Sequence, residues 1–145
     1  MDIINFVQIS DHIASSGQPS EDDFAQIAEL GYQTVINLAL ATSDNAIPSE
    51  GDIVTNFGME YVHIPVQWQN PTKNQFQLFA AIMQQQSSQK VWVHCALNMR
   101  VSAFLYLYNT ILLKVPESVA IQKLNQVWQP NEVWSQFISS VQNHA

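Results

Sequence analysis

The segment that most constrains the fold is VWVHCALNMRVSAFLYLY, residues 91–108, because it joins two apolar stretches of different character. Val91–His94 is short and rich in β-branched and aromatic side chains, which predicts a buried strand. From Arg100 to Leu113 the chain is apolar nearly all round, which predicts a helix buried in the middle of the fold. A chain with such a strand and such a helix must build its core around both.

Predicted strands and helices alternate through the rest of the chain. Apolar runs at 6–9, 13–15, 34–38 and 60–64 predict further strands. Helices are expected from the N-cap Ser20, near 49–57, from the N-cap Thr72, and after Pro116 and Pro130. This order predicts an α/β fold, a three-layer sandwich whose mainly parallel central sheet has helices on both faces. A length of 145 residues predicts a single domain over 1–145.

Cys95 and Arg100 are the only cysteine and the only arginine, and they flank the loop between the predicted strand and helix. Ligands of parallel sheets bind at the carboxyl ends of strands, where Cys95 falls. A helix start there would favour an anion and the thiolate form of a cysteine. An arginine grips two phosphate oxygens at once. The pair predicts a phosphate site with a nucleophilic thiol, whereas a lone buried cysteine would usually be inert packing.

Composition narrows the partners. The net charge of −7, with five basic residues, argues against nucleic acid and against anionic membrane surfaces. No apolar stretch is long enough to span a membrane. No spacing of His, Cys and Asp indicates a metal site, so we expect neither a metal nor a cofactor. One cysteine excludes an internal disulfide and fits a reducing compartment. We expect a cytoplasmic protein; the first residues do not form a signal peptide, although a leader upstream of residue 1 is compatible with the sequence.

His94, Cys95, a short loop and Arg100 resemble the signature loop of the cysteine-dependent protein phosphatases. GQPS, GYQTVINL, MEYVHIPV and HCALNMRVSAF follow one another as in a small bacterial group related to the dual-specificity phosphatases. That group, once a domain of unknown function, is often called the beta-lactamase-hydrolase-like phosphatases. The resemblance covers most of the chain, and HCALNMRVSAF is its most specific part.

The resemblance implies roles for the residues of this loop. Cys95 would attack phosphorus and carry a thiophosphate intermediate, and Arg100 would hold two phosphate oxygens. The anion cradle would be completed by the backbone N–H groups that follow the cysteine: Ala96, Leu97, Asn98, Met99 and Arg100 itself. The loop has no glycine, so Asn98 is expected to supply the left-handed conformation that such a turn needs.

Three neighbouring side chains have supporting roles in this scheme. Ser102 is expected either to hydrogen-bond the leaving thiolate or to cap the helix. His94 is expected to orient the loop through hydrogen bonds rather than to donate protons to substrate. Trp68 is expected either to wall the mouth of the pocket or simply to pack.

The sequence departs from these phosphatases at the general acid, the group that protonates the leaving oxygen. Relatives have an acidic residue after the tryptophan, where this chain has Gln69, and no Asp or Glu lies between Glu60 and Glu117. An amide cannot donate that proton, and losing the step costs about 10²–10⁴ in rate. The remaining candidates follow the predicted strand at 34–38, and we expect them to be solvated surface charges: Asp44, Glu50 and Asp52.

The sequence thus predicts a phosphatase that hydrolyses phosphomonoesters through Cys95, favours phosphotyrosine or aryl phosphates, and is weak for lack of an acid. Its partners would be a phosphorylated small molecule or a phosphoprotein, and it would bind oxyanions such as phosphate or sulfate. A phosphate- or phosphoprotein-binding module without turnover is a second interpretation. A rhodanese-like sulfurtransferase that carries a persulfide on Cys95 is a third, because only four residues separate Cys95 from Arg100, as in rhodaneses.

Overall fold

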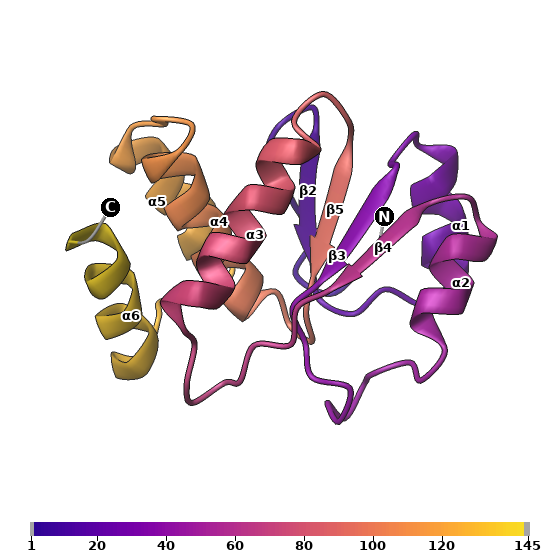
Figure 1. Ribbon diagram of the computed structural model, residues 1–145, viewed down its shortest axis with the longest axis horizontal. Helices are drawn as coiled ribbons and strands as arrows, with labels where there is room; N and C mark the ends of the chain where they lie inside the picture. The colour runs from indigo at the N-terminus through magenta and orange to yellow at the C-terminus, as the bar shows by residue number, and fades with distance from the viewer. Residues whose placement is uncertain (1, 144–145) are drawn as a thin grey trace.

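The computed structural model describes residues 2–143, which form one five-stranded sheet with helices on both faces (Figure 1). The strands are β1 (Val7–Gln8), β2 (Ile13–Ser16), β3 (Thr34–Asn37), β4 (Glu60–His63) and β5 (Val91–His94). Their spatial order is β1-β2-β5-β3-β4, and only the β1–β2 pairing is antiparallel. The predicted α/β sandwich with a mainly parallel sheet is therefore confirmed.

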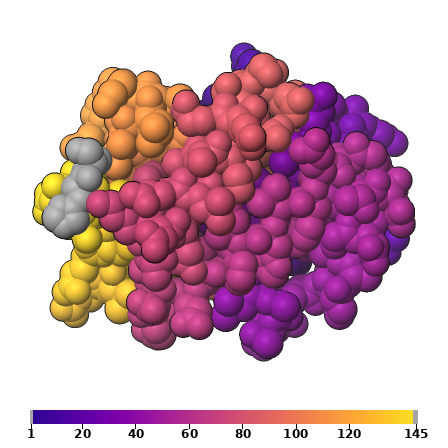
Figure 2. Space-filling view, viewed as in Figure 1, coloured from indigo at the N-terminus to yellow at the C-terminus, as the bar shows by residue number. Residues whose placement is uncertain are grey.

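Six helices complete the described part of the chain: α1 (Glu21–Glu29), α2 (Glu50–Asn56), α3 (Lys73–Gln85), α4 (Met99–Ile111), α5 (Glu117–Asn125) and α6 (Glu132–Asn143). Helices α1 and α2 cover one face of the sheet, and α3 to α6 lie on the other (Figure 1). In the space-filling view, α5 and α6 lie at one end of the molecule, beside α3 (Figure 2). No helix between residues 2 and 143 has the length and apolar character needed to cross a membrane.

Local sequence signals set the ends of several elements. Ser20 and Thr72 each accept a hydrogen bond from the backbone N–H three residues on, and each forms the expected capping box. The expected strand at 6–9 is shorter than predicted, because the N–H groups of Ile9 and Ser10 both donate to the carbonyl of Ile13 and turn the chain.

β5 lies in the middle of the sheet, and its alternating side chains reach two separate cores. Val91 and Val93 pack on the side of α3 to α6, whereas Trp92 packs on the side of α1 and α2. The same alternation turns the His94 ring toward Phe24 of α1, with ring centroids 5.9 Å apart, and turns Cys95 toward α4. His94 and Cys95, adjacent residues at the end of β5, therefore point to opposite faces of the sheet.

The carboxyl ends of three parallel strands lie level with one another. In the register of the sheet, His94 pairs with Ser16 of β2 on one side and with Asn37 of β3 on the other. The loops that follow β2, β3 and β5 therefore emerge side by side. Helix α4 then runs back through the interior, where Phe104 contacts four aromatic rings: Phe76, Phe79, Trp134 and Phe137.

Candidate active site

The loop after β5 turns sharply at Asn98 before α4 begins at Met99. Asn98 has φ 68°, the left-handed conformation that the glycine-free loop predicts. Its buried amide nitrogen donates to the carbonyl of Asn5 at 2.7 Å and to the hydroxyl of Ser15 at 3.1 Å. Asparagine tolerates this backbone conformation better than most residues, and the two hydrogen bonds fix it here.

The carbonyl groups of the loop are held from outside it. The Ala96 oxygen accepts from the backbone N–H of Gln18 and from the side chain of Asn45, both at 3.1 Å. The Leu97 oxygen accepts from the side chain of Asn5 at 2.9 Å. Across a trans peptide the N–H points opposite to the carbonyl, so the N–H groups of the next residues are directed toward the inside of the loop.

Four backbone N–H groups of the loop and of the start of α4 have no acceptor within the described part of the protein. Within residues 2–143, no backbone carbonyl accepts from the N–H of Ala96, Leu97, Met99 or Arg100. The last two belong to the first turn of α4, whose dipole adds positive potential at the same place. Together they form a site that is suited to an anion.

Gly17 lets a second loop support this arrangement. A Cβ atom added to Gly17 would lie 2.6 Å from the carbonyl oxygen of Ala96, closer than side chains normally come. The GQPS segment therefore does more than start α1, because it places Gly17 and Gln18 directly against the anion-binding loop. Sequence reasoning missed this role, since the contact joins residues 79 positions apart in the chain; a glycine at the end of the strand beside β5 was the available signal.

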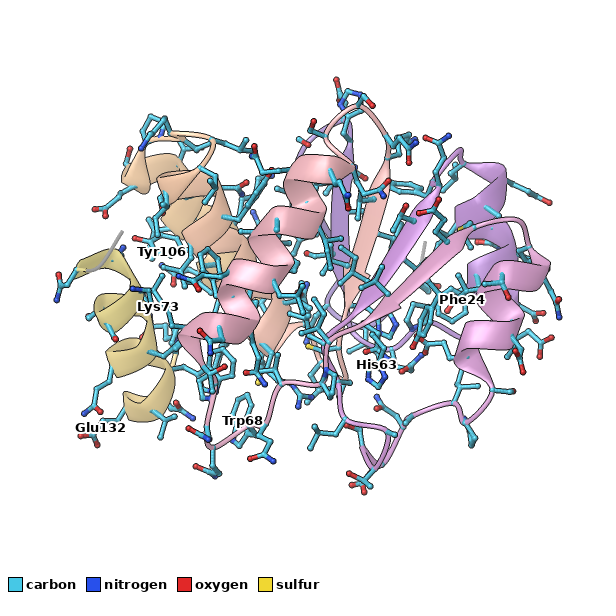
Figure 3. All side chains as sticks on the ribbon, in the orientation of Figure 1. Phe24, His63, Trp68, Lys73, Tyr106 and Glu132 are labelled. Carbon is cyan, nitrogen blue, oxygen red and sulfur yellow. The ribbon has the colours of Figure 1, made fainter. Side chains whose placement is uncertain are left out.

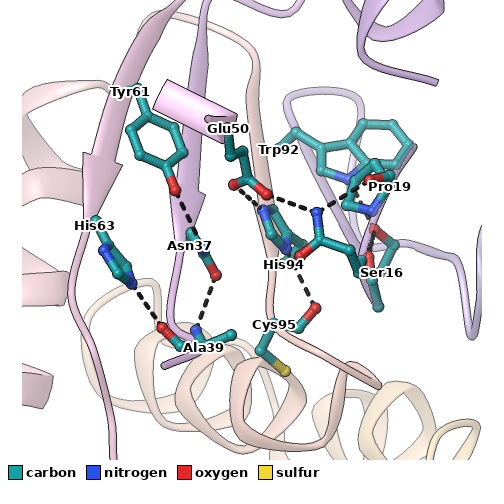
Figure 4. A network of polar contacts seen from close by, with 12 residues as sticks. Ser16, Pro19, Asn37, Ala39, Glu50, Tyr61, His63, Trp92, His94 and Cys95 are labelled. Atoms are coloured by element: carbon teal, nitrogen blue, oxygen red, sulfur yellow. Dashed lines mark hydrogen bonds and ion pairs between the residues drawn. The ribbon is translucent and has the colours of Figure 1, made fainter. Parts of the chain in front are cut away.

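His94 is paired with Glu50 behind the loop (Figure 4). The His94 Nε2 atom lies 2.7 Å from Glu50 Oε2, and the Gln18 side chain donates to Glu50 Oε1 at 2.5 Å. Glu50 is only 3% exposed, so the expectation that it is a solvated surface charge is wrong. It is buried because α2 begins at Glu50, directly over the end of β5 on the face that carries His94.

The surroundings of Glu50 keep it ionised. Burial pushes its pKa up, but hydrogen bonding and charge attraction from His94, with hydrogen bonds from Gln18 and Tyr61, outweigh burial and bring the pKa below its usual value. Burial also raises the pKa of Tyr61, and the nearby Glu50 charge adds to this effect, so Tyr61 keeps its proton. Glu50 is therefore an acceptor that holds His94, and His94 Nδ1 in turn lies 3.2 Å from the Cys95 carbonyl.

Cys95 and Arg100 meet in a cavity of about 560 Å³. Its walls come from the β3–α2 loop, from Trp68 and from the loop after β5: Leu40, Thr42, Ser43, Asp44, Asn45, Trp68, Cys95, Ala96, Leu97, Met99 and Arg100. Arg100 is largely buried, and its Nη1 donates to the carbonyl of Val66 at 3.1 Å. That bond fixes the guanidinium plane and leaves its other N–H groups for a ligand.

Trp68 lies on the long connection between β4 and α3, at the edge of the molecule toward which the parallel strands point (Figure 3). Its ring packs near Trp128 and Trp134, with centroids 5.3 and 5.8 Å away, and its carbonyl accepts from the Trp134 indole. Trp68 therefore packs against other aromatic rings and also lines the cavity, so the two expected roles are not exclusive.

Two other residues lie away from the cavity. The Ser102 hydroxyl donates to the carbonyl of Met99 at 2.9 Å and accepts from the Trp128 indole at 3.0 Å. These bonds tie the first turn of α4 to Trp128, and the N-cap of α4 is Asn98, so Ser102 neither caps the helix nor lines the cavity of the thiol. Gln69 lines a separate surface hollow with Asn70 and Lys73, not the cavity of Cys95. The residue after Trp68 thus points away from the expected acid position.

The carboxylates on the β3–α2 loop and α2 are separated by the structure. Asp44 lines the cavity, Glu50 is buried against His94, and Asp52 is exposed on α2 outside the cavity. Between residues 2 and 143 there is no group of three or more His, Cys, Asp or Glu side chains that could hold a metal ion.

Comparison with known proteins finds a matching family and similar solved structures. The profile of a family described as DSP-PTPase phosphatase fused to NAD+ kinase matches residues 8–136. A candidate phosphatase of the DUF442 group from Shewanella putrefaciens CN-32 is 36% identical, with a TM-score of 0.89 over 98% of this chain and 91% of that one. No curated protein sequence matches significantly.

Two more distant structures share the fold alone. The core catalytic domain of the PP-IP phosphatase SIW14 from Saccharomyces cerevisiae, in complex with citrate, is 14% identical, with a TM-score of 0.78 over 96% of this chain and 86% of that one. A variant of TpbA from Pseudomonas aeruginosa, in complex with pTyr, is 13% identical, with a TM-score of 0.68 over 97% and 91%.

Proposed function

We propose, since this chain belongs to the family of DSP-PTPase phosphatases fused to NAD+ kinase, that it hydrolyses phosphomonoesters through Cys95. The observation that carries the proposal is the shared cavity: a thiol, a fixed guanidinium and a loop of inward N–H groups converge there. Each of these three parts binds or attacks a tetrahedral oxyanion, and no other described cavity combines them.

The chemistry follows from these positions. The Cys95 thiolate attacks phosphorus and forms a thiophosphate, while the ester oxygen leaves. The N–H groups of the loop and the Arg100 guanidinium hold the three non-bridging oxygens, whose charge grows in the transition state. Water then attacks the thiophosphate and releases phosphate. Glu50 and His94 take no proton in this scheme, because they position the loop from behind.

The walls of the cavity favour a single phosphate on an apolar or aromatic group. Leu40, Trp68, Leu97 and Met99 give it apolar sides, and Arg100 is its only basic residue. Two lysines are engaged elsewhere, since Lys90 donates to the Leu30 carbonyl and Lys123 to the Gln8 carbonyl. Phosphotyrosine and other aryl phosphates carry one phosphate on an aromatic ring, which suits apolar walls and a single basic residue. The structure of the TpbA variant in complex with pTyr supports the same preference. A substrate with several phosphates would meet too little positive charge.

Partners and compartment follow the same chemistry. The substrate is a phosphorylated small molecule or a phosphoprotein, and free oxyanions such as phosphate compete for the cradle. A single catalytic thiol needs a reducing environment, which supports a cytoplasmic location.

A substrate panel tests this function. p-Nitrophenyl phosphate, phosphotyrosine, phosphoserine and an inositol polyphosphate are compared with wild-type protein and Cys95→Ser. We expect turnover of the two aryl esters, little of the other two, and none by Cys95→Ser. Anion binding without any turnover would instead show a binding module. Conversion of thiosulfate and cyanide to thiocyanate, with one extra sulfur on Cys95, would show a sulfurtransferase.

A further inference from the structure

The loop between β3 and α2 brings an exposed acidic residue to the wall of the cavity of Cys95 and Arg100. Asp44 lines that cavity, and among residues 2–143 it is the only Asp or Glu that does so. It comes from a different loop than Gln69, the residue found at the place in the sequence where relatives have an acidic residue. The cavity therefore contains one group that can carry a proton to the leaving oxygen.

The other carboxylates of this region cannot take that role. Glu50 is buried, accepts from His94 and Gln18, and has a lowered pKa, so it holds no proton to donate. Asp52 lies exposed on α2 and does not reach the cavity. Within the described chain the carboxyl oxygens of Asp44, by contrast, make no hydrogen bond or ion pair, which leaves them available to a substrate.

Hydrogen bonds hold the loop of Asp44 over the anion site. At its base, the carbonyl of Ala39 accepts from His63 at 2.6 Å, and the Ala39 N–H donates to the Asn37 side chain at 2.8 Å (Figure 4). Further along, the N–H of Ser43 donates to the Leu40 carbonyl and that of Ala46 to the Ser43 carbonyl, so Asp44 lies within a tight turn.

The residue after Asp44 ties this turn to the nucleophile loop. Asn45 donates its side-chain amide to the Ala96 carbonyl at 3.1 Å, one residue beyond Cys95. The position of Asp44 relative to Cys95 is thus set by contacts on both sides of the loop. The other titratable groups lining the same cavity are Cys95 and Arg100.

We propose that Asp44 is the general acid of this phosphatase, an inference that rests on the function proposed above. As the Cys95 sulfur bonds to phosphorus, the bond from phosphorus to the ester oxygen breaks, and that oxygen takes the proton of Asp44. The alcohol leaves, and Asp44 is a carboxylate. It then accepts a proton from the water that attacks the thiophosphate, so phosphate and the Cys95 thiolate are released and Asp44 is protonated again.

The test compares Asp44→Asn with Asp52→Asn, which removes one carboxylate from the same region but outside the cavity. Both variants and wild type are assayed on phosphotyrosine and on p-nitrophenyl phosphate, whose more acidic phenol departs without a proton. We expect kcat for phosphotyrosine to fall about 10²–10⁴-fold in Asp44→Asn. The fall on p-nitrophenyl phosphate is smaller, Asp52→Asn is close to wild type, and vanadate affinity is kept.

A pH profile adds a readout that a structural role would not change. Wild-type kcat for phosphotyrosine is expected to fall as the pH rises and the acid loses its proton, and this fall is absent in Asp44→Asn. Equal activities of Asp44→Asn and Asp52→Asn would overturn the role of Asp44 and leave that of Cys95 intact. Equal losses on both esters, with weakened vanadate binding, would show a loop-holding residue and also overturn it. No turnover by wild type would overturn the proposed function and this role with it.

Discussion

Replacing Glu50 by alanine removes the carboxylate that His94, Gln18 and Tyr61 all contact, and leaves the buried His94 and the half-buried Gln18 and Tyr61 without this acceptor. Breaking a buried ion pair from one side costs about 3–5 kcal/mol. Glu50→Gln keeps the shape but loses the charge, and its amide turns one acceptor into a donor. The loss of a charged hydrogen bond then costs about 1.5–3 kcal/mol. Asp52→Asn, on the exposed side of α2, is expected to cost less than about 1 kcal/mol.

Urea denaturation over a range of pH measures these differences in the free energy of unfolding. The folded-state pKa of Glu50 is below its ordinary value of 4.5, so the stabilisation is fully present above about pH 4.5 and is lost as the pH falls through the lowered pKa. The gap between wild type and Glu50→Gln should therefore be wide at pH 7 and close in acid. A gap that does not change with pH, or one no larger than that of Asp52→Asn, would refute the charge pairing.

Two further changes probe the anion-binding loop. Gly17→Ala places a Cβ atom 2.6 Å from the Ala96 carbonyl oxygen, so the loop must shift. We expect a loss of about 1–3 kcal/mol of stability in thermal denaturation and weaker vanadate binding in calorimetric titration. Unchanged vanadate binding would contradict the role of this contact. Arg100→Lys keeps the charge but loses the two-pronged grip and the bond to Val66, so phosphate affinity should fall about tenfold or more, whereas Lys90→Arg should leave it unchanged.

Elements with a strong local signal were predictable from the sequence. β5 and α4 follow from their apolar runs, the starts of α1 and α3 from their capping boxes, and the conformation of Asn98 from a turn that contains no glycine. These features depend on neighbours in the chain, so the residues alone are sufficient. The meeting of Cys95 and Arg100 at one cavity follows from the same local pattern.

Contacts between distant loops were not predictable in this way. Glu50 reaches His94 across 44 positions, and nothing in its neighbourhood distinguishes it from the exposed Asp52. Its burial is decided by where α2 packs on the sheet. Likewise, the bond between Ser102 and Trp128 depends on how the segment after α5 folds back on α4. The directions of Asp44 and Gln69 depend on how two loops cross the sheet edge, which no local pattern encodes.

Trapping the covalent intermediate tests the central claim most directly. Wild-type protein is mixed with p-nitrophenyl phosphate, quenched within one turnover, digested and mapped by mass spectrometry. We predict one phosphoryl group on the peptide that carries Cys95, formed as fast as the first equivalent of nitrophenol is released and absent in Cys95→Ser. Release of nitrophenol at the same rate by Cys95→Ser, or a phosphoryl group on any other residue, would contradict nucleophilic catalysis by Cys95.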